Sequence, residues 1–234
     1  MPGTLFSPGF QLNPVAKGSP KALVLLLRDA GTTIETVASV AARWAVSVPA
    51  AAFAALDGIR QIEPVSEVVR STIADPRNGA ESEWLDAARS LAPLVAQELR
   101  ARRLDASQSV LVGFGSGGTL ALHLVLRQGW SCAGVLAFAP TLTDPPPRTV
   151  RRNHKIRLID SVSNSSGAHA GGRDAVSILV HRGIDVRRVR LSGPMLSEEA
   201  IRHGALYLAE LVATAQWRGR LPVVQGTAKG AGDV

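Results

Sequence analysis

The sequence predicts a mainly parallel, doubly wound α/β sheet with flanking helices, folded as a single domain. Short, continuous apolar runs recur along the chain, and each has the length of a buried parallel strand, as residues 21–27 illustrate. Segments with helical spacing separate these runs, and this alternation is typical of parallel sheets. The run over 109–114 also stops at a turn of small residues, 113–118, where a helical pattern starts at once.

The expected elements follow one another without an internal repeat. Residues 1–20 are rich in proline and glycine, so we expect an irregular lead-in before a domain over 21–216. The glycine-rich residues 217–234 predict a flexible tail. Apolar runs predict strands at 21–27, within 46–56, and at 109–114, 132–139, 155–160 and 185–191. Helical spacing predicts helices at 34–44, 82–99 (interrupted or kinked at Pro93), 119–127, 175–182 and 198–212.

Composition limits the class of protein. The chain has 234 residues, of which 46% are hydrophobic, and this suits one domain with a sizeable buried core. Its single cysteine, Cys132, excludes an internal disulfide and fits a reducing compartment. The first residues lack the charged and apolar regions of a secretory signal, and no apolar run is long enough to span a bilayer. We therefore expect a cytoplasmic protein without a membrane span.

The turn after the strand at 109–114 has the context of a nucleophile elbow. In an elbow, G-x-S-x-G joins a strand to a helix and presents a serine at the top of the sheet. Here Gly113 and Gly117 match the flanking glycines, and the nucleophile position is Gly115. Glycine adopts the strained backbone of that position freely, so the fold is kept while the nucleophile is lost. A glycine-rich turn with no site at all is the alternative interpretation.

Over about residues 20–215, the chain resembles the bacterial carboxylesterase/lysophospholipase family of small serine esterases in the α/β-hydrolase superfamily. The elbow of that family typically reads G-F-S-Q-G-G, so Gly115 replaces the serine and Ser116 replaces the glutamine. The resemblance places the catalytic aspartate at Asn164 and the catalytic histidine at Pro194. Glycine and proline have no nucleophilic or ionisable side chain, so the proton relay of a serine esterase cannot be assembled there.

The resemblance also implies where an oxyanion hole and a pocket would lie. The hole would be formed near Ala30 and Ser116, in a loop where the family has H-G-x-G and this chain has Arg28-Asp29-Ala30-Gly31. A carboxylate at Asp29 would oppose the negative charge that builds up on an oxyanion. The predicted pocket would be bordered by the residues Phe53, Phe114 and Met195.

Two functional hypotheses from different classes follow. The first is a catalytically inactive homologue, a pseudoenzyme that acts as a subunit binding a small apolar or acyl ligand or a protein. The alternative is a weak serine hydrolase acting on carboxylic esters, in which Ser116 is the relocated nucleophile and His169 its base. We expect no cofactor and no metal, because no cluster has the spacing of metal ligands and the glycine run lacks the lysine of a P-loop.

The formal net charge of +7 raises the question of an acidic partner. No nucleic-acid motif or set of stacking aromatic residues accompanies the arginines, which disfavours nucleic acid. A basic face that binds an acidic protein is one interpretation, and an ordinary solvated surface is the other. The residues proposed for the basic face are Arg148, Arg151, Arg152, Arg188 and Arg190.

Overall fold

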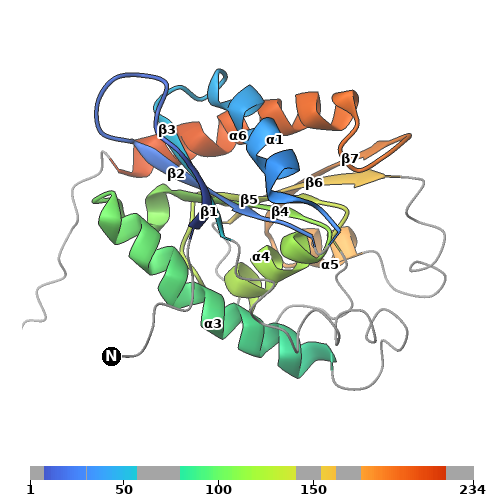
Figure 1. Ribbon diagram of the computed structural model, residues 1–234. Coiled ribbons are helices and arrows are strands. Elements are labelled where there is room, and N and C mark those ends of the chain that lie inside the picture. Colours follow the sequence, from blue (N-terminus) through green and yellow to red (C-terminus); the bar gives the residue numbers. More distant parts are fainter. Residues whose placement is uncertain (1–7, 30, 57–79, 141–153, 162–174, 220–234) are drawn as a thin grey trace, which may run out of the picture.

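The computed structural model describes residues 8–29, 31–56, 80–140, 154–161 and 175–219 (Figure 1). These residues form one sheet with helices on both faces, as predicted. The strands are β1 (Pro8–Leu12), β2 (Ala22–Leu27), β3 (Ala51–Leu56), β4 (Ser109–Phe114), β5 (Gly134–Phe138), β6 (Lys155–Ser161) and β7 (Asp185–Leu191). The helices are α1 (Ile34–Ala45), α3 (Ala80–Ala101), a 3₁₀ turn η2 (Ala106–Gln108), α4 (Ser116–Leu126), α5 (Ala175–His181) and α6 (Glu198–Arg218).

The strand order in the sheet is β1-β3-β2-β4-β5-β6-β7. All neighbouring strands run parallel except β1, which is antiparallel to β3. Strands β2, β3, β4 and β5 are buried along their whole length. This burial agrees with the continuous apolar runs in their sequences, because helices cover both faces of a doubly wound sheet. The mainly parallel sheet predicted from the sequence is confirmed.

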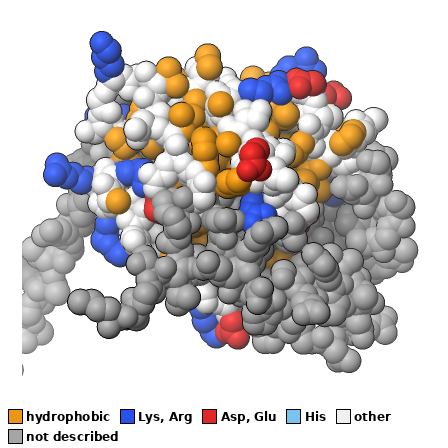
Figure 2. Space-filling model, viewed as in Figure 1, with side chains coloured by type: hydrophobic (Ala, Val, Ile, Leu, Met, Phe, Trp, Pro, Cys, Tyr) orange, Lys and Arg blue, Asp and Glu red, His pale blue; other side chains and the backbone are white. Residues whose placement is uncertain are grey.

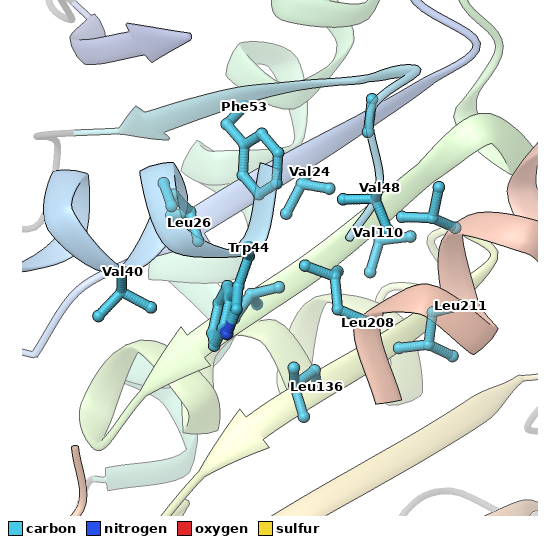
Figure 3. Close-up of a cluster of buried hydrophobic side chains, with 14 of the residues drawn as sticks. Val24, Leu26, Val40, Trp44, Val48, Phe53, Val110, Leu136, Leu208 and Leu211 are labelled. Carbon is cyan, nitrogen blue, oxygen red and sulfur yellow. The ribbon is translucent and has the colours of Figure 1, made fainter. Parts of the chain in front are cut away.

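Two hydrophobic cores lie on opposite faces of the sheet. Successive side chains of β2 alternate between them, so that Leu25 faces one core and Leu26 the other. In Figure 1, α1 and α6 cover one face while α3, α4 and α5 cover the other. We name these layers the α1/α6 core and the α3/α4 core. Figure 3 shows side chains of β2, β3, β4 and β5 meeting α1 and α6, with Trp44 of α1 among them.

Two boundaries differ from the sequence prediction, and one alternative that it left open is decided. The irregular lead-in expected over 1–20 contains β1, whose Phe10 and Leu12 pack against the α1/α6 core. The three prolines and three glycines among residues 1–18 hide this short edge strand, and Pro8 is its first residue, where a strand tolerates proline. Helix α6 runs on through Arg218, past the predicted start of the tail at 217. Helix α3 continues through Pro93 and is not interrupted there.

Candidate functional site

The candidate site lies where β2 and β4 end side by side. The parallel pairing of these strands places Leu27 opposite Gly113. Two residues further along each chain, Asp29 and Gly115 therefore meet beyond the ends of the strands. This carboxyl edge of a parallel sheet is where binding sites of open α/β folds are formed.

The elbow predicted at 113–117 is present as a backbone structure. Gly115 has φ 51° and ψ −117°, a conformation that residues with a side chain rarely adopt. Its N–H donates to the carbonyl oxygen of Phe138 at 2.8 Å, which ties the turn to the neighbouring strand β5. Its carbonyl oxygen accepts from the N–H of Thr119 at 3.1 Å, which closes the first turn of α4.

Close backbone contacts explain the glycines on either side of position 115. A Cβ atom at Gly117 would lie 2.1 Å from the carbonyl oxygen of Leu27. A Cβ atom at Gly113 would lie 2.4 Å from the backbone of Gly117. Both positions therefore exclude a side chain, because the atoms they would strike are main-chain atoms of the sheet and the helix.

The side chain of Asp29 occupies the space that a side chain at position 115 would need. A Cβ atom at Gly115 would lie 2.8 Å from Cγ of Asp29 and 2.9 Å from its Oδ1. The same Oδ1 accepts two hydrogen bonds from Ser116, one from the backbone N–H at 3.1 Å and one from the hydroxyl at 2.6 Å. The Asp29 carboxylate is thus bound at the N-terminus of α4, where helix N–H groups favour negative charge.

The turn that follows Asp29 holds it in place. The backbone N–H of Thr32 donates to the carbonyl oxygen of Asp29 at 3.0 Å. The guanidinium of Arg28, itself buried, donates to the carbonyl oxygen of Thr32 at 3.0 Å. Thr33 then caps α1 by accepting from the N–H of Thr36. Asp29 is therefore positioned by the start of α1 as well as by α4.

This arrangement has clear chemical limits. Position 115 supplies no nucleophilic side chain, and the hydroxyl of the adjacent Ser116 donates its proton to a carboxylate. A carboxylate is a much weaker base than the imidazole that activates the serine of a hydrolase. The N–H of Ser116, a donor that an oxyanion would need, is already bound to Asp29.

The other predicted site residues have different surroundings. Pro194 is exposed in the turn between β7 and α6, and this turn is held by a hydrogen bond from the Ser161 hydroxyl to the Gly193 carbonyl oxygen. Met195 is partly buried against the α1/α6 core. Ala30, Asn164 and His169 lie outside the described residues.

The two phenylalanines expected to border a pocket are core residues in the described structure. Phe53 and Phe114 are both fully buried in the α1/α6 core. The ring of Phe114 lies 5.0 Å from that of Phe138 and 6.3 Å from that of Trp44, measured between centroids. Both side chains pack on the face of the sheet that α1 and α6 cover.

Sequence analysis missed a charged cluster around Arg157 in β6. This side chain is 0% exposed, and its guanidinium contacts both carboxylate oxygens of Glu210 (2.6 and 2.9 Å) and of Asp185 (3.0 and 3.1 Å). Burial opposes the charge of Arg157, but the hydrogen bonds to Glu210 and Asp185 outweigh it and raise its pKa. The hydrogen bond from Arg157 lowers the pKa of Glu210. The signal in the sequence was an arginine between Ile156 and Leu158, inside an apolar strand.

Two of the five arginines predicted for the basic face, Arg188 and Arg190, lie among the described residues. Arg188 forms an ion pair with Asp160, and both side chains are largely buried. Arg190 is exposed on the edge strand β7, while Arg148, Arg151 and Arg152 lie outside the described residues. Figure 2 shows lysines and arginines spaced apart on the face in view, not gathered in one patch. Arg188 therefore adds little exposed positive charge to the predicted basic face, because Asp160 pairs with it.

Two further features concern only the described part of the chain. It contains no group of three or more histidine, cysteine, aspartate or glutamate residues that could hold a metal ion. It also contains no helix with the length and hydrophobicity needed to cross a membrane.

Comparison with known proteins identifies the family. The family model described as Phospholipase/Carboxylesterase matches residues 17–158, more than half of the chain, and this match includes the elbow but ends before positions 164 and 194. No curated protein shows a significant sequence match.

Solved structures agree with the family match. The crystal structure of esterase PE8 is similar with a TM-score of 0.64 and 20% identity, covering 88% of this chain and 99% of that one. A carboxylesterase from Mesorhizobium loti has a TM-score of 0.62 and 16% identity, with 81% and 88% covered. The Bacillus cereus carboxylesterase has a TM-score of 0.62 and 11% identity, with 86% and 93% covered. The chain has the α/β-hydrolase fold and belongs to the phospholipase/carboxylesterase family.

Proposed function

We propose that this protein is a catalytically inactive member of its family that acts as a ligand-binding or protein-interaction subunit. The observation that carries the proposal is the elbow itself, where Gly115 lacks a nucleophile and the Asp29 carboxylate fills the space beside it. The resemblance to serine esterases adds Asn164 and Pro194 at the other two triad positions. The single cysteine, Cys132, which is buried and free, supports a cytoplasmic location.

The size of the expected loss supports this choice over slow hydrolysis. Removing single members of a catalytic triad lowers the rate by roughly 10⁴- to 10⁶-fold, and the losses of several members do not add. Oxyanion stabilisation can leave a residual acceleration of about 10³- to 10⁴-fold after such losses. Here the Ser116 N–H is bound to Asp29, so it is not available to stabilise an oxyanion, and we expect this residual acceleration to be reduced as well.

The first prediction is that the purified protein does not hydrolyse short or medium acyl esters above background and is not labelled by a fluorophosphonate probe. The physical reason is the absence of an activated hydroxyl at position 115. Mass spectrometry of the intact protein measures the labelling, and p-nitrophenyl acetate and butyrate measure turnover.

A Ser116→Ala variant is the matched control for the alternative hypothesis. The Ser116 hydroxyl lies at the elbow and is hydrogen-bonded to a carboxylate, which is the observation that favours a relocated nucleophile. Stoichiometric labelling of the wild type that disappears in Ser116→Ala would establish the weak hydrolase and refute the inactive protein.

A thermal-shift screen with fatty acids and lysolipids separates the two binding roles. A ligand that binds only the folded state raises the melting temperature by mass action. Stabilisation would support a small apolar or acyl ligand, bound near Met195. No response across the series would favour a protein partner, for which the exposed Arg190 is the remaining described residue of the basic face.

A further inference from the structure

We propose that Asp29 determines the specificity of this site, because it is an internal anion that excludes carboxylates and acyl oxyanions from the N-terminus of α4. This inference rests on the proposed function in taking the site as non-hydrolytic. It adds which ligand groups the site rejects, and it names the residue that rejects them.

The first step concerns the donors. The first N–H groups of a helix have no partner within the helix and attract anions. At α4, an eleven-residue helix, the N–H of Ser116 donates to Oδ1 of Asp29. The Ser116 hydroxyl donates to the same atom. An external anion that binds the N–H of Ser116 would therefore have to replace Asp29.

The second step concerns charge. Asp29 is partly exposed, and the structure records no cationic partner for its carboxylate among the described residues. Within the described part of the chain, this charge is held by the N-terminus of α4 and not by an ion pair. A second anion a few ångströms away would be repelled by this charge.

The third step concerns space. With Cγ and Oδ1 of Asp29 within 3 Å of where a Cβ atom at position 115 would lie, any side chain there displaces the carboxylate. The Asp29 side chain can therefore occupy its position only because residue 115 is a glycine. A serine returned to position 115 would find the volume for its side chain filled and its neighbouring N–H donor occupied.

Acetate binding to Asp29→Ala tests the proposal. We expect acetate to shift the amide resonance of Ser116 in this variant, with an affinity at least about tenfold higher than in the wild type. Acetate should also raise the melting temperature of Asp29→Ala above that in sodium chloride of equal ionic strength. The matched control is Asp86→Ala, which removes an exposed carboxylate of α3 and should respond like the wild type.

A second measurement uses the coupling between positions 29 and 115. We expect Gly115→Ser to lower the melting temperature of the wild type, and at least half of that loss to disappear in the Asp29→Ala background. If Asp29→Ala does not fold, Asp29→Ser provides a smaller side chain that can still accept from α4, and the Gly115→Ser comparison is made in that background.

Equal acetate responses in wild type and variant, or equal losses from Gly115→Ser in both backgrounds, would overturn the proposal. Fluorophosphonate labelling of the wild type would refute the inactive protein but leave the acetate comparison unchanged. The two proposals can therefore fail separately.

Discussion

Asp29 and Arg157 are both charged residues of the sheet and its carboxyl edge, and they differ in burial and in partners. Arg157 lies within β6, fully buried, and its guanidinium is matched by the carboxylates of Glu210 and Asp185. Asp29 lies beyond the end of β2, partly exposed, and its carboxylate is held by an N–H and a hydroxyl of Ser116. Among the described residues, Arg157 is thus paired with opposite charges, whereas Asp29 is held by uncharged hydrogen-bond donors.

This difference explains why we regard the Arg157 cluster as structural and the surroundings of Asp29 as a candidate site. Every N–H group of the Arg157 guanidinium has an acceptor, since the backbone carbonyls of Ile156 and Asp185 complete the set. Such a closed network leaves nothing for a ligand to bind. The carboxylate of Asp29, in contrast, is partly exposed at the carboxyl edge of the sheet, and no ion pair to another described residue holds it, so it could affect which ligands approach.

The largest expected effect comes from breaking the Arg157 cluster. Glu210→Ala leaves a buried guanidinium with one carboxylate in place of two, and we expect the free energy of unfolding to fall by about 3 kcal/mol. Urea unfolding followed by circular dichroism measures it. Glu198→Ala is the control, because Glu198 pairs with Arg43 on the surface and its side chain is 82% exposed, so little change is expected. Similar losses in both variants would contradict the structural role of the cluster.

A smaller effect should appear as acid sensitivity. The hydrogen bond from Arg157 lowers the pKa of Glu210 below its ordinary value of 4.5, so the folded state favours the ionised carboxylate. Its contribution to stability is therefore present above pH 4.5 and lost as the pH falls through the lowered pKa. Urea midpoints measured across this range should fall less steeply in Glu210→Gln than in the wild type. Parallel profiles would show that Glu210 does not contribute to the loss.

The smallest effect is expected at Asp29. Asp29→Asn keeps the shape and an acceptor oxygen but removes the charge at the N-terminus of α4, and we expect a loss of about 1 kcal/mol in the free energy of unfolding. Added salt should reduce this loss, because the Asp29 carboxylate is partly exposed to solvent. A loss in the free energy of unfolding as large as that of Glu210→Ala would show that Asp29 has a mainly structural role, as Arg157 does, and would contradict the difference proposed between them.

Much of the fold could be predicted because short sequence patterns indicate its strands and helices. The apolar runs of β2 and β4 reflect burial on both faces, and the spacing in α1 reflects one buried side. The cap of α6 is equally local, since Ser197, directly before the helix, accepts from the N–H of Ala200. The antiparallel β1 was missed because proline and glycine mask a short edge strand that only its pairing with β3 stabilises.

The sequence by itself determined the elbow and the loss of its serine, because both depend on residue types within a few positions of Gly115. It also placed a carboxylate near that turn, through the order of residues after β2. Only the tertiary structure decided that Asp29 fills the space beside Gly115, since this depends on the register of β2 against β4. The same holds for Arg157, whose partners Asp185 and Glu210 lie 28 and 53 residues away and meet it only when β7 and α6 pack against β6.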